Sequence, residues 1–293
     1  MLENQYKGRG IHDEKMYNSL LNGNLRKMLN VVAENDDLDV QIRNDYLNIY
    51  YRGGNIAKVN SERSIEFDEK YFCLPGIDTN GKEEKRGLVE KFKKCDYKAY
   101  FETAKQVMDK WFKEHPNPER DEQHLLAVAN KYAQSDYTII DLEYQVSIQS
   151  EFSCTFTPQG KSKPKKPRFD IIAVNKRGQV AVIELKKGVG ALENTSGLQE
   201  HLDCYNASIG KNYAPFMSEM QKLLAQKQQL GLADNAIRIT DQAPVFMFAY
   251  AYNDSILDEE QSRKFMKIYD SIKSGSPVSV IWLERGSHKL LDL

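Results

Sequence analysis

The chain is 293 residues long, with 41% hydrophobic, 28% charged and 10% aromatic residues. This composition and a mean hydropathy of -0.62 are typical of a globular protein and exclude a membrane protein. The net charge of -1 argues against a protein that coats nucleic acid through bulk electrostatics. Residues 1–10 lack the apolar stretch of a targeting signal, and the longest apolar run, 245–252, is too short to span a bilayer. We therefore expect a cytoplasmic protein that contacts no membrane.

The first 116 residues are predicted to form an accessory α+β region. Hydrophobic residues at helical spacing predict a helix at 16–33 and a second helix at 88–113, which stops at His115-Pro116. Strand-like runs between these helices predict a small β-meander with a tight turn at Gly53-Gly54. The predicted strands are 38–43, 46–51 and 56–60.

Residues 117–293 are predicted to form the core of the protein. Asn117 is a helix cap followed by proline at the first helical position, which predicts a helix to about residue 134. Strands and helices alternate after it, and this order predicts an α/β fold with a mixed central β-sheet flanked by helices. The predicted strands are 137–148, 169–174, 180–186, 245–252 and 278–283, and the predicted helices start at 196, 216 and 258.

Cysteine and histidine spacing does not indicate a zinc site or an iron-sulfur cluster. The four cysteines contain no CxxC pair, and the five histidines form no HExxH motif. We expect reduced, structural cysteines, and we assign no role to any histidine. The histidines are His12, His115, His124, His201 and His288.

Basic residues gather between positions 158 and 187, although the whole chain is close to neutral. Nine lysine and arginine side chains stand in this segment against Asp170 and Glu184, a local charge of +7. Such a patch suits contact with a phosphate backbone, and a lysine-rich solvated loop is the alternative. The residues that we expect to bind nucleic acid are Lys161, Lys163, Lys165, Lys166, Arg168 and Lys187.

Two charged residues lie within an apolar strand. Side chains alternate along 180–186, so Glu184 and Lys186 project from the same face as Val180 and Val182. An ordinary central strand would carry more apolar residues at these positions. An exposed hairpin with a Glu184–Lys186 ion pair is the alternative.

The loop before this strand predicts which residue faces Glu184. Residues 176–178 form a three-residue loop with glycine at the position that needs a positive φ, a favoured hairpin connection. In that register Asp170 lies opposite Glu184, with Cβ atoms about 4.5–5.5 Å apart. A four-residue loop would instead place Asp170 opposite Ile183.

Facing carboxylates suggest a cation site. They are unfavourable unless one is protonated or a cation lies between them, and oxygen ligands favour Mg²⁺ or Mn²⁺. Such a cation lowers the pKa of a bound water, and Lys186 can position or deprotonate that water. Asp170, Glu184 and Lys186 therefore predict metal-assisted hydrolysis of phosphodiester bonds, with Mg²⁺ or Mn²⁺ as cofactor.

These residues resemble the PD-(D/E)xK nuclease superfamily, whose motif is an Asp on one strand followed by (Asp/Glu)-x-Lys on the next. Phe169-Asp170 and Glu184-Leu185-Lys186 match this motif, whereas Pro167 lies three residues before Asp170 and departs from the family's usual spacing. The element order of residues 117–285 also matches. The resemblance implies a restriction-endonuclease-like fold and a magnesium-dependent deoxyribonuclease.

The resemblance implies two further site residues. Members often carry a Glu on the helix before the first strand. Glu122 matches as a third metal ligand and continues an apolar stripe at helical spacing, formed by Leu125, Leu126, Ala129 and Tyr132. A solvated first-turn acid is the alternative, and Glu119, Asp121 and Glu143 compete for the role.

The second position is a Gln on the helix after the lysine strand, which Gln199 matches as a candidate catalytic residue. Ser196-x-x-Gln199 is also a capping box, which is a complete structural explanation for the same residue.

Three functions follow from these patterns. The first is a metal-dependent nuclease with DNA as its expected substrate. The alternative is a catalytically inactive module of the same fold that binds nucleic acid or acts as a scaffold. The third is an unrelated α/β domain, in which Asp170, Glu184 and Lys186 would lie apart. A monomer and a homodimer both remain open.

Overall fold

The computed structural model describes residues 8–73, 81–132, 135–146, 167–190, 192, 197–272 and 278–292. Over these residues the chain is a mixed α/β protein with one four-stranded and one five-stranded sheet. It divides into two compact units. The first comprises Met1–Val128 with Ala225–Leu232, and the second comprises Ala129–Leu224 with Ala233–Leu293.

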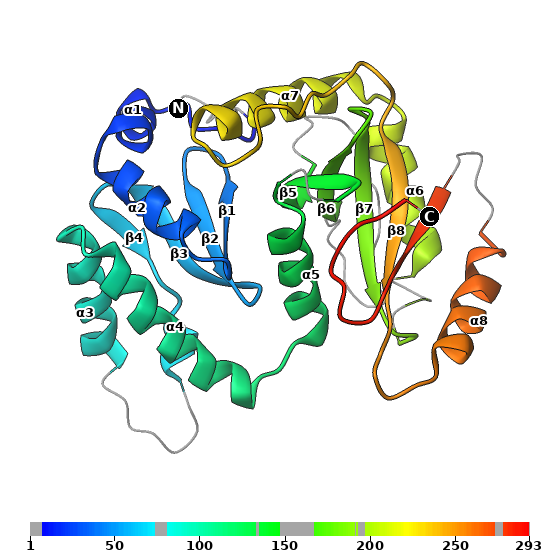
Figure 1. The fold of residues 1–293 in the computed structure, drawn as a ribbon, viewed down its shortest axis with the longest axis horizontal. Helices are drawn as coiled ribbons and strands as arrows, with labels where there is room; N and C mark the ends of the chain where they lie inside the picture. Colours follow the sequence, from blue (N-terminus) through cyan, green and yellow to red (C-terminus); the bar gives the residue numbers. More distant parts are fainter. Residues whose placement is uncertain are drawn as a thin grey trace, which may run out of the picture. The chain divides into compact units, whose positions relative to one another are not determined.

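The first unit contains an antiparallel sheet of strand order β1-β2-β3-β4 (Figure 1). Gly53, at the turn between β2 and β3, has φ +70, so the predicted meander and its tight turn are confirmed. The short fourth strand extends the meander by one hairpin. The strands are β1 (Leu38–Ile42), β2 (Leu47–Tyr51), β3 (Gly54–Ser61) and β4 (Ser64–Glu66).

Helices pack against this sheet, with α2 on β1, α4 on β3 and α3 on β4. At the start of α5 the Asn117 Oδ1 accepts a hydrogen bond from the Arg120 amide at 3.1 Å, which confirms the predicted cap. The helices are α1 (Glu14–Asn22), α2 (Asn24–Ala33), the 3-10 helix η1 (Glu69–Phe72), α3 (Gly81–Lys93), α4 (Tyr97–Glu114) and α5 (Pro118–Ala129).

Two predicted helices of this unit are each divided in two. The helix predicted at 16–33 breaks at Gly23, whose backbone is extended (φ -101, ψ -154). A Cβ at this glycine would lie 2.8 Å from the Ser19 Cα, so the close approach requires glycine. The helix predicted at 88–113 is interrupted before Asp96, whose side chain caps α4 by accepting from the Ala99 amide at 3.3 Å.

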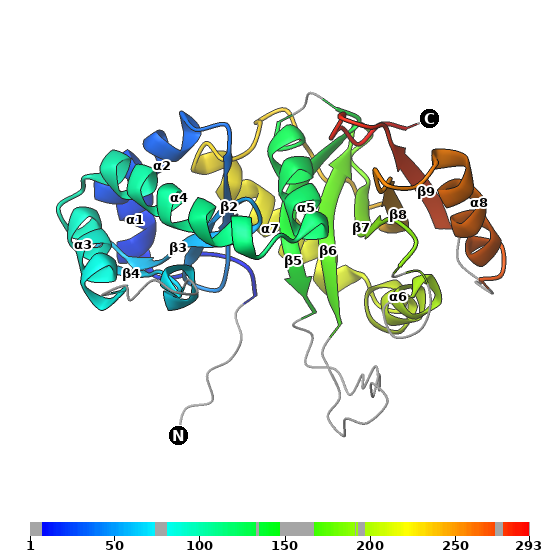
Figure 2. The same ribbon diagram turned by 90° about the horizontal axis from the view of Figure 1, so that it is seen from below.

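The second unit contains a five-stranded sheet of order β5-β6-β7-β8-β9 (Figure 2). β5, β6 and β7 pair antiparallel, whereas β7, β8 and β9 pair parallel. β7 is therefore central, and every residue from Val180 to Lys186 is buried. The strands are β5 (Tyr137–Gln145), β6 (Arg168–Asn175), β7 (Val180–Lys187), β8 (Val245–Ala251) and β9 (Val278–Leu283).

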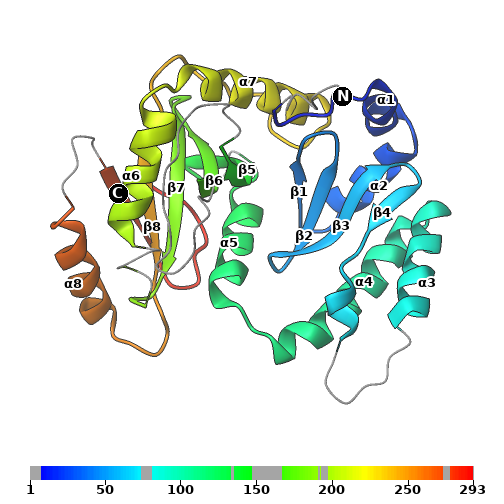
Figure 3. The same ribbon diagram turned by 180° about the vertical axis from the view of Figure 1, so that it is seen from behind.

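The parallel strands are connected by helices that contact β8. Tyr205 of α6 stacks on Phe246 at a ring distance of 5.0 Å, and its hydroxyl donates to the Pro244 carbonyl oxygen at 2.7 Å. Figure 3 shows α6 lying across β7 and β8. Phe265 of α8 lies 4.7 Å from the ring of Tyr250. These helices are α6 (Leu198–Tyr205), continued by a π-helical turn (Asn206–Gly210), α7 (Ala214–Gln229), which the division between the units crosses, and α8 (Asp258–Tyr269).

The β6–β7 turn has the predicted geometry. The Asn175 amide donates to the Gln179 carbonyl oxygen at 3.0 Å, and Gly178 has φ +83. The paired residues run from Val174↔Val180 to Ile171↔Ile183. The predicted register is therefore confirmed, and its continuation places Asp170 beside Glu184.

Among the residues that the structure describes, no helix combines the length and apolar character needed to cross a membrane. Cys73 and Cys95 are free thiols, and Cys154 lies outside the described residues.

Gly178→Ala should destabilise the second unit more than Gly286→Ala. Both glycines have positive φ, +83 and +73, so alanine costs about 1–2 kcal/mol of left-handed strain at either position. At Gly178 the new Cβ would also lie 2.8 Å from the Arg238 carbonyl oxygen, whereas no described residue has an atom within 4 Å of it at Gly286. Urea unfolding of both variants measures the difference. Equal losses of stability would show that the turn can move without cost.

Candidate active site

The β6–β7 ladder changes at Asp170. Hydrogen-bonded and non-hydrogen-bonded pairs alternate along an antiparallel ladder. Asn175 and Gln179 form a hydrogen-bonded pair, so in a regular ladder Phe169 and Leu185 would form one as well, and the Leu185 amide would donate to the Phe169 carbonyl oxygen. Instead it donates to the carboxylate of Asp170, with a distance of 3.0 Å to Oδ2. The Asp170 side chain therefore replaces a strand carbonyl and lies against β7 next to Glu184.

The two carboxylate oxygens of Glu184 have different surroundings within the described residues. Its Oε1 lies 3.3 Å from the Nζ of Lys186 and 3.0 Å from the Nδ1 of His201. Its Oε2 is buried and has no hydrogen-bond partner among the described residues. The side chains of Glu184 and Lys186 are each only 4% exposed, so the predicted alternative of an exposed ion pair is wrong.

Burial and charge both act on Glu184. Burial, followed by repulsion from the Asp170 carboxylate, raises the pKa of Glu184 well above its usual value, and Lys186 partly opposes this effect. An isolated buried carboxylate is costly unless it is paired or bound to a cation. One lysine and one imidazole on Oε1 leave Oε2 in a position that suits a cation.

His201 was not predicted to have a role, and the structure places it against Glu184. It stands on α6 with Leu198, Leu202 and Tyr205, which are all buried at helical spacing. A histidine three residues after Leu198, within this stripe and on the helix after the lysine strand, was a usable signal. The spacing of paired ligand motifs, on which the histidine prediction depended, does not include this position.

Apolar side chains surround the two charged residues of β7. In the parallel register, Glu184 lies beside Phe248, and Lys186 lies beside Tyr250. Both aromatic side chains are fully buried. The low polarity of these neighbours strengthens electrostatic interactions inside the site.

The loop after β8 lies close to the end of β7. The Gly188 amide donates to the Ala251 carbonyl oxygen at 2.9 Å, and a Cβ at Gly188 would lie 3.1 Å from the Asn253 Cβ. Ligands of α/β proteins commonly bind beyond the carboxyl ends of parallel strands. This loop therefore lies at the carboxyl end of β7, the end that carries Lys186.

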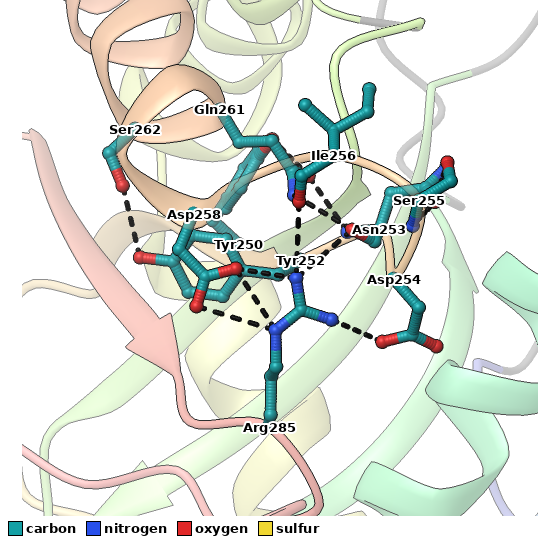
Figure 4. A network of polar contacts seen from close by, with 10 residues as sticks. All are labelled: Tyr250, Tyr252, Asn253, Asp254, Ser255, Ile256, Asp258, Gln261, Ser262 and Arg285. Atoms are coloured by element: carbon teal, nitrogen blue, oxygen red, sulfur yellow. Dashed lines mark hydrogen bonds and ion pairs between the residues drawn. The ribbon is translucent and has the colours of Figure 1, made fainter.

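Arg285 holds that loop in place (Figure 4). Its guanidinium pairs with the carboxylates of Asp254 and Asp258, the Nε lying 3.0 Å from Asp258 Oδ1, and donates to the Asn253 carbonyl oxygen at 3.1 Å. The buried Gln261 side chain adds bonds to the Asn253 amide at 2.7 Å and carbonyl oxygen at 2.8 Å. The loop is thus fixed by side chains from α8 and from the segment after β9.

Glu122 and Gln199 are the other two residues predicted for the site. Glu122 is buried but belongs to the first unit, and its role as a ligand stays a prediction. Gln199 is exposed and donates to Asp203 Oδ1 at 2.8 Å. Because two residues along a helix differ by about 200°, Gln199 and His201 lie on opposite faces of α6. His201 rather than Gln199 contacts Glu184, and the role of Gln199 also stays a prediction.

Two details of the helix predictions are wrong. The predicted inward stripe of α5 fails because Leu125 and Tyr132 are 43% and 36% exposed, whereas His124, Leu126 and Ala127 are buried beside Glu122. The helix predicted to start at residue 196 begins at Leu198, with Gly197 as its N-cap. Ser196 of the predicted capping box lies outside the described residues.

The structure describes only two of the six residues that were predicted to bind nucleic acid. Lys161, Lys163, Lys165 and Lys166 lie outside the described residues. Arg168 is exposed and pairs with Glu143, the Nε lying 2.9 Å from Oε2. Lys187 is half-buried at the end of β7. Nucleic-acid contacts by these residues stay predictions.

A cavity of about 390 Å³ lies at the opposite end of the β6–β7 hairpin, around the turn. Its lining includes Lys176, Arg177 and Arg238 but none of the residues predicted for the site. Lys176 pairs with Asp136 at 2.5 Å, and the turn amides of Arg177 and Gln179 both donate to the Asn175 side chain. The Lys176, Asp136 and Asn175 side chains of this cavity are thus engaged within its lining and the adjacent turn.

No protein-family model, curated protein or solved structure matches the chain in comparisons with known proteins.

The side chains of the site supply oxygen ligands of the kind that a divalent cation prefers. Within the described ranges, no group of three or more His, Cys, Asp or Glu side chains is arranged to hold a metal ion. Mg²⁺, however, is usually bound through one or two carboxylates together with waters and substrate phosphates. Asp170 and Glu184, whose buried Oε2 has no hydrogen-bond partner in the described part of the chain, fit that mode of binding.

The metal-free protein should lose stability as the pH rises, and Glu184→Gln should remove this dependence. Because the pKa of Glu184 is raised, the folded state retains a proton that the unfolded state releases. The resulting stabilisation is complete below the unfolded pKa of about 4.3 and disappears as the pH rises through the raised pKa, by up to about 1.4 kcal/mol per pH unit.

Urea unfolding in EDTA, from about pH 4.5 to about pH 8, measures this effect. Glu184→Gln should be more stable than the wild type near neutral pH. Glu259→Gln, at an exposed position of α8, is the control and should follow the wild type. Parallel pH profiles for the wild type and Glu184→Gln would contradict the assignment.

Proposed function

We propose that the chain is a metal-dependent nuclease that hydrolyses phosphodiester bonds, with DNA as its substrate. The observation that carries this proposal is the buried Glu184 Oε2 without a hydrogen-bond partner among the described residues, beside Asp170 and on the same strand as Lys186. A site with this donor chemistry suits a hard cation, Mg²⁺ or Mn²⁺.

The element order supports a restriction-endonuclease-like core as part of this proposal. One helix precedes three antiparallel strands, and helices then lead to a strand that is parallel to the third. In this arrangement β6 contributes Asp170, and the neighbouring β7 contributes Glu184 and Lys186. The sheet thus brings together three residues that are up to sixteen positions apart in the chain.

Each residue of the site has a separate role in the proposed reaction. Asp170 and Glu184 would hold the cation through their carboxylates. The cation, when bound, polarises the phosphoryl oxygen and lowers the pKa of a water ligand. Lys186 positions the attacking water and offsets negative charge that develops on the phosphate. Phe248 and Tyr250 keep bulk water away from the β7 side chains, which strengthens these interactions.

Lys186→Met should lower the cleavage rate by about 100-fold or more, because it removes the charge that serves the attacking water. Methionine keeps much of the side-chain volume at this buried position. Cleavage would be measured on single-stranded and double-stranded DNA and RNA with Mg²⁺, with Mn²⁺ and with EDTA. The melting temperature would establish that the variant is folded.

The control is Lys264→Met, at a more exposed lysine of α8 that pairs with Glu260; it should cleave like the wild type. Full activity in Lys186→Met would refute the assigned role of the lysine. A folded wild-type protein that binds nucleic acid and cleaves no substrate with either metal would instead support the catalytically inactive module.

Replacing Lys161, Lys163, Lys165 and Lys166 with glutamine should weaken binding to all nucleic-acid sequences. Each lost phosphate contact should flatten the plot of log affinity against log salt by about 0.9 for double-stranded DNA. Fluorescence anisotropy at several salt concentrations measures this slope. A matched control replaces four exposed lysines of the first unit, Lys82, Lys93, Lys94 and Lys98. Unchanged affinity at low salt would leave residues 161–166 as a solvated loop.

A further inference from the structure

The two oxygens of the Glu184 carboxylate have different surroundings. Oε1 receives two nitrogen groups, Lys186 Nζ at 3.3 Å and His201 Nδ1 at 3.0 Å. Oε2 receives none among the described residues. The terminal torsion of a glutamate is soft and nearly two-fold. Donors on one oxygen are therefore needed to determine where the other oxygen points.

His201 is better suited than Lys186 to determine that orientation. A lysine ammonium is a point charge on a flexible four-carbon stem, whereas an imidazole is a rigid ring with two side-chain torsions. The His201 side chain is 22% exposed. It stands on α6, which Tyr205 anchors to the sheet through its stacking on Phe246 and its bond to the Pro244 carbonyl oxygen. The ring is thus held at a defined distance from β7.

We propose that His201 is a positioning residue, which donates a hydrogen bond from Nδ1 to Glu184 Oε1 and thereby directs Oε2 toward the cation. This inference rests on the metal binding of the proposed function. It assigns a role to a residue that acts through Glu184 and need not touch the substrate. Partners of this kind typically change metal affinity by about 10–100-fold when they are removed.

Three substitutions separate a hydrogen-bond donor from other roles of the ring. His201→Asn keeps an N–H donor near the position of Nδ1, because both nitrogens are bonded to the γ carbon. His201→Gln moves the donor to the position of Nε2, and His201→Leu removes it. The control His115→Leu changes an exposed histidine of the first unit, which stacks on Trp111.

Calorimetry with Mn²⁺, on the full chain without nucleic acid, measures the effect. His201→Leu and His201→Gln should bind Mn²⁺ about 10–100-fold more weakly than the wild type. His201→Asn should recover most of the affinity, and His115→Leu should not differ from the wild type. Wild-type affinity in His201→Leu would overturn the proposal. Equal losses in His201→Asn and His201→Leu would also overturn it, because the ring would then act by some means other than donation.

The metal-free protein provides a second measurement. Long-range ¹H–¹⁵N spectra of the imidazole should show a proton on Nδ1 of His201. An Nε2–H ring with bare Nδ1 would overturn the proposal, whatever the result with Mn²⁺.

The same experiments separate the two proposals. If Mn²⁺ binds with the expected pattern and no substrate is cleaved, the nuclease assignment fails and the role of His201 stands. If DNA is cleaved and His201→Leu binds Mn²⁺ like the wild type, only the role of His201 fails. A wild-type protein that binds no Mn²⁺ overturns both.

Discussion

The register of the β6–β7 hairpin brings two carboxylates, Asp170 and Glu184, together inside an apolar sheet. A three-residue turn closed by Gly178 determines this register, and a slip by one residue would move Asp170 to the other face. Like charges at this distance repel, and burial adds to their cost. The raised pKa of Glu184 results from both effects. The other groups of the site offset part of this repulsion and of the cost of burial.

Hydrogen bonds and ion pairs offset the cost of the buried carboxylates at some oxygens more than at others. This difference connects the energetics of the site to the proposed chemistry. The Leu185 amide satisfies one oxygen of Asp170, and Lys186 and His201 contact one oxygen of Glu184. The other oxygen of Glu184 is buried without a partner among the described residues. A sheet selected for stability alone would place an apolar residue at this position. Retaining a carboxylate there is expected of a site that a cation completes, since binding to the folded state alone stabilises it.

Elements outside the hairpin determine how rigid the site is. α6 carries His201 and is anchored to β8 through Tyr205. The loop after β8 is held by Arg285 and Gln261, and it passes close to Gly188 at the end of β7. Groups that bind a metal and orient a substrate are most effective when their neighbours lock them in place. Both supports come from chain segments after β7, so the sheet is assembled from distant parts of the sequence.

The sequence alone determined the features that depend on local geometry. The strands from residue 137 onward, the turn with its glycine and the Asp170–Glu184 register follow from side-chain alternation and from loop length, which are set by neighbouring residues. Gly23 and Asp96 are also local signals of a helix break. The prediction nevertheless continued each helix through them, because apolar residues recur at helical spacing on either side.

Only the tertiary structure decided which helix face meets the sheet and how deeply each charge is buried. His201 and Gln199 stand on the same short helix, and the family resemblance favoured Gln199, yet the packing of Tyr205 turns His201 toward Glu184. The stripe of α5 was predicted from Leu125 and Tyr132, yet His124 is buried in their place. The reason is physical: periodicity shows that a helix has an apolar side, whereas the contacts of that side depend on segments far away in the chain.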